Sequence, residues 1–156
     1  MAVILRPVRE NDMDSMYGML SDPESRQMAP FVALEFTDRA TFNERMAELQ
    51  ADPSVMLYAV VAGGHFVGAC MSFDTELGRE IFYWIRRLAW GRGISTEGLA
   101  QLLKIDHTRP IYARVTDQNE RALAVLSKLA FEEVSRRSHE VTPGGPSLTE
   151  IVLVKK

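Results

Sequence analysis

The chain has 156 residues, 46% of them apolar and 25% charged, with 18 basic against 21 acidic side chains and a formal net charge of −3. This length and composition are typical of one globular domain, so we expect residues 1–156 to form a single unit. The charge balance lacks the basic footprint that sequence-independent binding to nucleic acid requires, and excludes that class.

The first half of the chain predicts one short strand and two helices. Residues 3–6 are rich in β-forming side chains, whereas residues 10–21 and 38–50 carry apolar side chains at helical spacing. Asp-Pro pairs follow both helical segments and predict their ends. Residues 24–36, between the two helices, show neither pattern and are expected to be irregular.

The middle of the chain predicts an antiparallel meander. Residues 56–62 form a compact apolar strand, Gly63-Gly64 a hairpin turn, and residues 65–73 the returning strand. A third strand, residues 79–86, is rich in aromatic and β-branched side chains. The connections are too short for crossovers, so these strands must be antiparallel.

The last part of the chain predicts a parallel crossover followed by a helix and two strands. A glycine turn follows the strand at 79–86, after which a helix runs to about residue 106 and a further strand covers 111–116, which together make a parallel βαβ unit. One more helix and two final strands are expected at residues 119–129, 131–141 and 148–154. The predicted fold is α+β, with a mixed, mostly antiparallel sheet of six to seven strands, a central parallel crossover and about four helices.

The glycine turn is the segment whose chemistry is most informative. In Gly91-Arg92-Gly93-Ile94-Ser95-Thr96, glycines let the backbone turn sharply and approach a ligand without a Cβ in the way. The first N–H groups of the following helix lack internal partners and sit at the positive end of its dipole. Such a helix end favours a phosphate or diphosphate, with hydroxyl groups and one arginine available to help.

The sequence of this turn has three other interpretations. It could be a tight strand-to-helix connection that binds nothing. A dinucleotide site is disfavoured, because Thr96 stands where its third glycine would be and an antiparallel meander precedes the turn. A nucleotide-dependent oxidoreductase is therefore a minor alternative. A P-loop is excluded, because the segment has no Gly-Lys-Ser/Thr.

These residues resemble a known family. Residues 83–97 look like motif A of the GNAT superfamily of N-acetyltransferases, in particular the branch containing the ribosomal-protein N-terminal acetyltransferases. The family pattern Gln/Arg-x-x-Gly-x-Gly/Ala falls on Trp90 to Ser95, with Trp90 and Ser95 as substitutions. Residues 119–131 look like the family's Asn-x-x-Ser/Ala…Glu-Lys-x-Gly-Phe stretch, with Ala130 in place of the glycine.

The resemblance implies that acetyl-CoA binds between the strands at 79–86 and 111–116. Its pantetheine arm would follow the backbone near residues 83–85, its diphosphate would lie on the amides of the glycine turn, and Asn119 would bond near the thiol end. Asn119 could equally be a helix N-cap, and the two roles can coexist. The implied cofactor-binding residues are Tyr83, Trp84, Ile85, Gly91, Arg92, Gly93, Ile94, Ser95, Thr96 and Asn119.

A base is needed to take a proton from the amine that attacks the thioester, because a lysine-type amine has a pKa of about 10.4. We expect Glu80 in this role, since it lies on the strand entering the cofactor site and by alternation shares a face with Phe82 and Trp84. The competing interpretation is a salt-bridged surface glutamate. Leu126 stands where many family members have a tyrosine that protonates the departing thiolate, so the general acid is unassigned.

The other candidate groups predict no chemistry. Cys70, the single cysteine, lies in an apolar stretch and is expected to be a small core side chain. His65, His107 and His139 have no catalytic partner pattern, and no set of side chains has the spacing of a metal site.

The sequence thus predicts an enzyme that moves an acetyl group from acetyl-CoA to a primary amine, by direct attack in a ternary complex. The alternative is a regulatory module that binds acyl-CoA without turnover. The acceptor would be a protein N-terminus or a small amine, lined by residues 24–36, 74–78 and 142–147. A cytoplasmic setting is expected, with no role for membranes, and the two final strands could support a homodimer.

Overall fold

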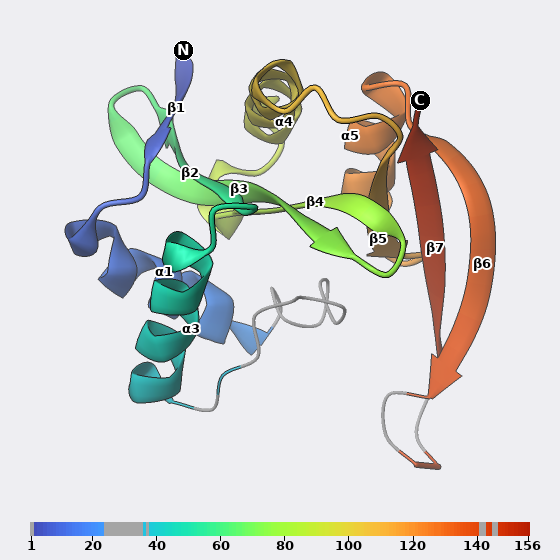
Figure 1. Ribbon diagram of the computed structural model, residues 1–156, viewed down its shortest axis with the longest axis horizontal. Coiled ribbons are helices and arrows are strands. Elements are labelled where there is room, and N and C mark those ends of the chain that lie inside the picture. The colour runs from blue at the N-terminus through green and yellow to red at the C-terminus, as the bar shows by residue number, and fades with distance from the viewer. Residues whose placement is uncertain (1, 24–35, 37, 141–142, 145–146) are drawn as a thin grey trace.

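The computed structural model describes residues 2–23, 36, 38–140, 143–144 and 147–156. Within them, seven strands form one sheet in the order β1-β2-β3-β4-β5-β7-β6 (Figure 1). The strands are β1 Val3–Pro7, β2 Met56–Ala62, β3 His65–Thr75, β4 Gly78–Ile85, β5 Ile111–Thr116, β6 Glu132–Glu140 and β7 Ser147–Lys155. The helices are α1 Met13–Ser21, α3 Arg39–Ala51, α4 Ile94–Ile105 and α5 Glu120–Lys128, with 3₁₀ turns η1 Glu10–Asp12 and η2 Arg87–Ala89.

The predicted mixed sheet is confirmed, and its single parallel pair lies at its centre. Strands β4 and β5 run parallel through the crossover helix α4, whereas every other pair is antiparallel. The pairing of β4 with β5 covers Arg79↔Ile111 and Glu80↔Tyr112. Because β4 continues to Ile85, the two strands separate over most of their length.

Helices cover both faces of the sheet. Figure 1 shows α4 and α5 on one side and α1 and α3 on the other. The first side buries the predicted stripe of α4, Leu99 and Leu102 among it, together with Leu126 of α5. The second side buries Phe42 and Met46 of α3 with other side chains. Strand β4 contributes to both cores, because successive side chains of a strand point to opposite faces.

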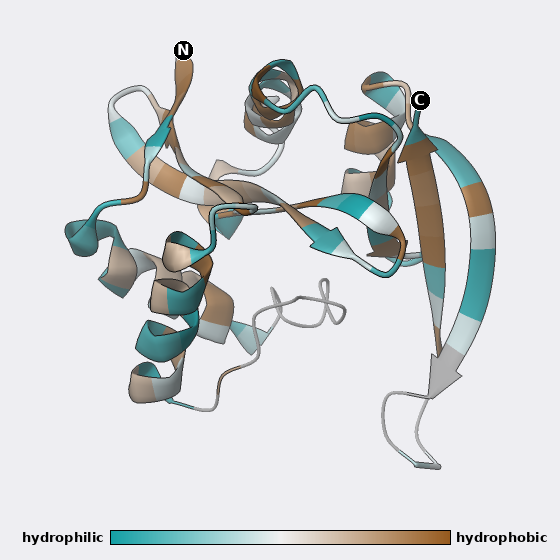
Figure 2. Ribbon diagram, viewed as in Figure 1, coloured by the Kyte–Doolittle hydropathy of each residue, from teal (hydrophilic) through white to brown (hydrophobic). Residues whose placement is uncertain are grey.

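The two final strands differ in polarity. Figure 2 shows β7 as largely hydrophobic and β6 as largely hydrophilic. Residues 150–154 of β7 are buried, whereas residues 132–138 of β6 are exposed. β6 is therefore the solvated edge strand, and its one large apolar side chain that is exposed, Val134, is 54% accessible.

Some predicted boundaries were wrong. Helix α4 begins at Ile94, earlier than expected, because Gly93 adopts a left-handed conformation and serves as its N-cap. Strand β3, expected to end at residue 73, continues to Thr75, which pairs with Gly78 across a two-residue turn. Residues 24–35, expected to be irregular, lie outside the described residues.

A buried ionic network joins the sheet to the end of α4. The Arg79 Nε donates to Asp106 Oδ2 at 2.8 Å, and the Ser72 hydroxyl donates to the same oxygen at 2.6 Å. Arg79 Nη1 also donates to the backbone carbonyl of Ser54 at 2.6 Å. Asp106 is 2% exposed. This network fixes the start of β4 relative to β3 and to the crossover.

Gly68 of β3 marks a close approach of two backbones. A Cβ at Gly68 would overlap the carbonyl oxygen of Trp84 and lie 2.9 Å from the Ile85 Cα. We expect Gly68→Ala to lower the free energy of unfolding by about 1–3 kcal/mol, as overpacking does. Gly18→Ala is the control: a Cβ there meets nothing within 4 Å, and alanine should stabilise helix α1 by about 0.5–1 kcal/mol. Urea denaturation giving equal effects for both variants would contradict this.

Candidate active site

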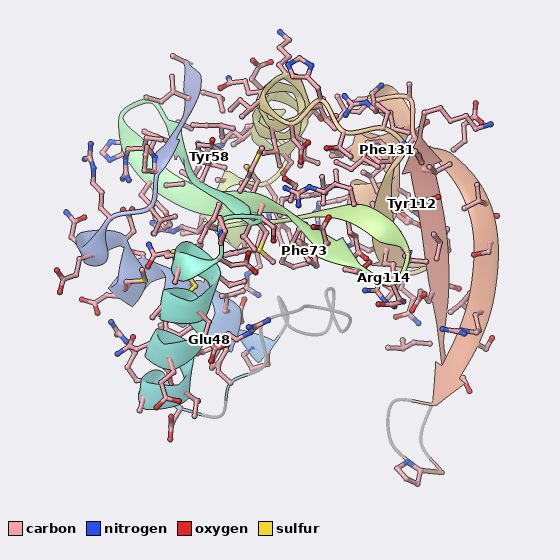
Figure 3. All side chains as sticks on the ribbon, viewed as in Figure 1. Glu48, Tyr58, Phe73, Tyr112, Arg114 and Phe131 are labelled. Carbon is pink, nitrogen blue, oxygen red and sulfur yellow. The ribbon has the colours of Figure 1, made fainter. Side chains whose placement is uncertain are left out.

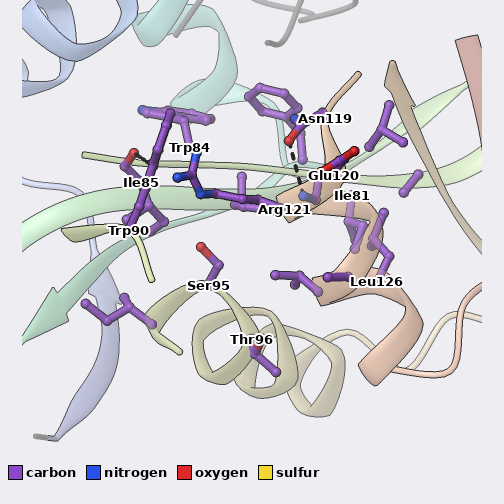
Figure 4. Close-up of a pocket in the computed structure, with 18 of the residues that line it drawn as sticks. Ile81, Trp84, Ile85, Trp90, Ser95, Thr96, Asn119, Glu120, Arg121 and Leu126 are labelled. Carbon is purple, nitrogen blue, oxygen red and sulfur yellow. Dashed lines mark hydrogen bonds between the residues drawn. The ribbon is translucent and has the colours of Figure 1, made fainter. Parts of the chain in front are cut away.

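A cavity of about 810 Å³ opens where β4 and β5 separate (Figure 4). Helices α4 and α5 contribute to its walls, and so do Met19 and Leu20 of α1. The cavity brings together ten of the eleven site residues that the sequence predicted. They are Glu80, Tyr83, Trp84, Ile85, Gly91, Gly93, Ile94, Ser95, Thr96 and Asn119. The eleventh, Arg92, is exposed and is not among the residues that line the cavity.

The glycine turn delivers the start of α4 to the cavity. Gly91 and Gly93 have φ values of 79° and 75°, in the left-handed region that favours glycine. A Cβ at either position would meet no atom within 4 Å, so the space beside this backbone is open. The first backbone bond of the helix runs from Glu97 N to Gly93 O, so the amides before it have no acceptor within the helix. The arrangement favours an anion at this end of the cavity.

An aromatic ring and a guanidinium flank the same end. The Trp90 Nε1 donates to the carbonyl of Ile85 at 2.8 Å, which ties the turn to the end of β4. The Arg121 guanidinium lies over the Trp90 ring, 4.6 Å from its centroid (Figure 4). Arg121 was not predicted from the sequence. It adds positive charge from α5 to the dipole of α4.

Asn119 confirms its predicted role as a helix cap. Its side-chain oxygen accepts a hydrogen bond from the Ala122 backbone at 3.2 Å, which satisfies one free amide at the start of α5. Leu126, further along α5, is 1% exposed and also lines the cavity. The aligned position therefore offers a hydrocarbon surface and no proton donor.

Glu80 is buried and paired, so the expectation of a surface glutamate is wrong as to its exposure. Glu80 is 4% exposed. Arg114 of β5 binds it through Nη2 to Oε1 at 3.0 Å and Nε to Oε2 at 3.2 Å, and Thr75 donates to Oε1 at 3.0 Å. Burial raises the pKa of the Glu80 carboxyl above its usual value, although the bonds from Arg114 and Thr75 and the Arg114 charge oppose this.

The predicted alternation along β4 is confirmed. The rings of Phe82 and Trp84 pack with centroids 5.3 Å apart, on the face toward α1 and α3. Figure 3 shows Arg114 on that same side of the sheet, away from α4 and α5. The indole nitrogen of Trp84 is buried without a hydrogen-bond partner in the described part of the chain. This side of the cavity is thus lined by two aromatic rings and by the Glu80–Arg114 ion pair.

The remaining candidate groups take no part in the site. Burial raises the pKa of the Cys70 thiol to about 12, so it stays protonated and acts as a small core side chain, as predicted. His65 and His107 are exposed, and the His139 side chain lies outside what the structure describes. Within the described ranges, no three His, Cys, Asp or Glu side chains gather as metal ligands would, and no helix is long and apolar enough to cross a membrane.

Comparison with known proteins gives a family and a set of similar structures. The family model described as acetyltransferase (GNAT) domain matches residues 2–132. No curated protein matches the sequence. Spermidine N-acetyltransferase from Vibrio cholerae, solved with CoA and spermine, is 15% identical with a TM-score of 0.83, covering 98% of this chain and 94% of its own.

Two further structures cover nearly all of this chain. RimJ from Mycobacterium smegmatis, in complex with CoA-disulfide, is 23% identical with a TM-score of 0.79, and the match covers 98% of this chain and 81% of that one. A ribosomal-protein-alanine N-acetyltransferase from Brucella melitensis is 17% identical with a TM-score of 0.81, covering 97% and 98%. At these identities the likeness establishes the fold alone.

Proposed function

The chain belongs to the GNAT family of acetyltransferases and is therefore an acetyltransferase, and we propose that it transfers an acetyl group from acetyl-CoA to a primary amine within a ternary complex. The observation that carries this proposal is the cavity between the separated strands β4 and β5, with the start of α4 open to it. Free amides at a helix start suit the diphosphate of CoA. The separation of the two strands leaves room for the extended pantetheine arm of CoA.

The donor's expected contacts follow from the lining of the cavity. The amides of the glycine turn would hold the diphosphate, helped by the hydroxyl groups of Ser95 and Thr96 and by Arg121. The backbone of residues 83–85 is not paired with β5 and would bind the pantetheine arm. Asn119, which lines the cavity as it caps α5, would contribute near the thiol end.

The proposed reaction is a direct displacement. The amine nitrogen attacks the thioester carbonyl carbon, the carbon–sulfur bond breaks, and CoA departs as a thiolate. The amine's proton passes to Glu80, directly or through one water. No side chain is assigned to protonate the thiolate, because Leu126 offers none.

The acceptor is a primary amine whose class the fold leaves open. The similar structures include a spermidine acetyltransferase and a ribosomal-protein acetyltransferase, so both small amines and protein N-termini belong in a screen. Release of CoA from acetyl-CoA should be measured with polyamines, amino acids, aminoglycosides and N-terminal peptides. Turnover on one class would support the proposal. Tight binding of acetyl-CoA without turnover on any acceptor would favour a non-catalytic acyl-CoA-binding module instead.

Replacing Gly93 should weaken acetyl-CoA binding. We expect Gly93→Leu to raise the Kd, measured by calorimetry, by about 10–100-fold, since a side chain there enters open space beside the helix start and displaces charge-assisted hydrogen bonds. Gly93→Ala adds the same backbone strain with little bulk and should weaken binding less.

Gly144 provides a matched control for that strain. It has the same φ of 75° and the same open surroundings, but it lies in the loop before β7 and does not line the cavity. Gly144→Leu should lower thermal stability slightly and leave the acetyl-CoA Kd unchanged. Equal losses of affinity in the two leucine variants would place the diphosphate elsewhere.

The cytoplasmic setting and the homodimer stay predictions. A chain whose single cysteine is buried and unpaired suits a reducing compartment. The exposed edge strand β6 could pair with a second copy, and analytical ultracentrifugation would test this.

A further inference from the structure

Glu80 occupies a distinctive place in the sheet. It is the last residue of β4 that pairs with β5, opposite Tyr112, so the two strands part immediately beyond it. Arg114 lies two residues past Tyr112 on the diverging strand, and Figure 3 shows both on β5. The Glu80–Arg114 ion pair therefore bridges the two strands where the cavity begins, and both side chains line it.

The contacts of the Glu80 carboxylate leave it one open position. A carboxylate has about four lone-pair sites. Oε1 accepts from Thr75 and from Arg114, whereas Oε2 accepts from Arg114 Nε. One lone pair of Oε2 therefore has no donor in the described part of the chain. Because Arg114 grips both oxygens as a fork, it fixes which oxygen keeps that capacity.

We propose that Arg114 is the positioning residue of Glu80: it holds the carboxylate where the two strands part, with one lone pair of Oε2 left to take the acceptor's proton. The inference rests on the proposed function. Arg114 itself does not touch the reacting atoms. Arg114 also donates from Nη1 to Glu76 Oε1 at 3.2 Å, an exposed carboxylate in the turn before β4.

The charges around the pair determine what its loss would do. Thr75 of β3 and Glu76 of the following turn face Glu80, Arg114 faces it from β5, and Glu150 of β7 acts on Arg114. Without Arg114, burial and the negative charge of Glu76 would act on Glu80 unopposed except by the Thr75 hydroxyl. An adjacent arginine lowers a carboxyl pKa by about 1–3 units, so its removal should raise the Glu80 pKa by a similar amount.

The test uses Arg114→Met and Arg114→Lys, with Arg136→Met as the matched control. Arg136 pairs with Glu133 on the exposed edge strand β6, away from the cavity. One readout is the pH profile of kcat/KM with one acceptor throughout, so that the acceptor's own ionisation cancels. The other is the ¹³C NMR titration of the Glu80 carboxyl in the ligand-free protein, assigned by its loss in Glu80→Gln.

In Arg114→Met we expect the acid limb of kcat/KM and the NMR midpoint of Glu80 to move together to higher pH, by about 1–3 units. Arg114→Lys, which keeps the charge but not the fork, should move them less, and Arg136→Met not at all. Activity lost equally at every pH, with an unmoved NMR midpoint, would overturn the inference and leave a structural ion pair. Wild-type protein that turns over no acceptor would instead overturn the proposed function, and the NMR arm distinguishes that failure because it needs no turnover.

Discussion

Glu80→Gln is expected to lower kcat by about 10²–10⁴-fold while the Kd for acetyl-CoA changes little. Glutamine has nearly the same shape and its amide oxygen can still accept from Arg114, but it cannot take a proton from the amine. Glu80 lies near the start of β4, whereas the glycine turn follows the end of that strand. Steady-state rates and calorimetric titration of acetyl-CoA would measure the two effects separately.

Glu76→Gln is the control for this variant. Glu76 is the other carboxylate bonded to Arg114, yet its side chain is 76% exposed, so its loss should change kcat only slightly. A Glu80→Gln enzyme with the wild-type rate across the pH range would remove Glu80 from the mechanism. Loss of acetyl-CoA affinity in the same variant would assign Glu80 to cofactor binding instead.

Asp106→Ala should lower the free energy of unfolding by about 3–5 kcal/mol, the usual consequence of leaving a buried charge without its partner. The substitution leaves the Arg79 guanidinium, whose side chain is 8% exposed, without its buried partner. It also removes the acceptor of the Ser72 hydroxyl. Because these groups join β3, β4 and the end of α4, the loss should be felt in the global transition. Urea denaturation followed by circular dichroism would measure it.

Asp74→Ala is the matched control, because Asp74 bonds the same arginine at 3.3 Å from a side chain that is 66% exposed. Its cost should stay below about 1 kcal/mol. A cost for Asp106→Ala no larger than this would mean that the network contributes little to stability.

The pH dependence of stability gives a second check on Asp106. Burial alone would raise its pKa, but hydrogen bonds from Ser72, Arg79 and the Thr108 backbone hold the pKa of this carboxyl well below its ordinary 3.8. Its contribution is thus fully present above the unfolded value and is lost as the pH falls below it. The stability of Asp106→Ala should accordingly vary less with pH in the acid range than that of the wild type.

The elements of this fold were largely predictable because their causes are local. The apolar and β-branched runs in residues 56–86, broken by Gly63-Gly64, predict the meander, and the helical stripe of Leu99 and Leu102 predicts a buried helix. Of the two boundaries that failed, one depends on pairing between strands and the other on the backbone conformation of a single glycine. Thr75 is in a strand because Gly78 pairs with it, and α4 begins early because Gly93 takes a left-handed conformation.

The candidate site divides in the same way. The glycine turn was identifiable as a candidate anion site from the sequence, because a strand, two glycines and a helix start lie within a few residues of one another. Arg114 and Arg121 were not, although both line the cavity. Arg114 is 34 residues from Glu80, and nothing along the chain indicates that the two would meet.

The sequence by itself determined the order of the elements, the parallel crossover and the backbone amides at the start of α4, because each follows from neighbouring residues. Only the tertiary structure decided that Glu80 is buried and bound by Arg114. That pairing depends on the register of β4 against β5, which the packing of α4 across the sheet sets, and on the point at which the two strands part. The register between strands that are distant in the sequence places these two charges side by side, and the local sequence pattern does not contain that register.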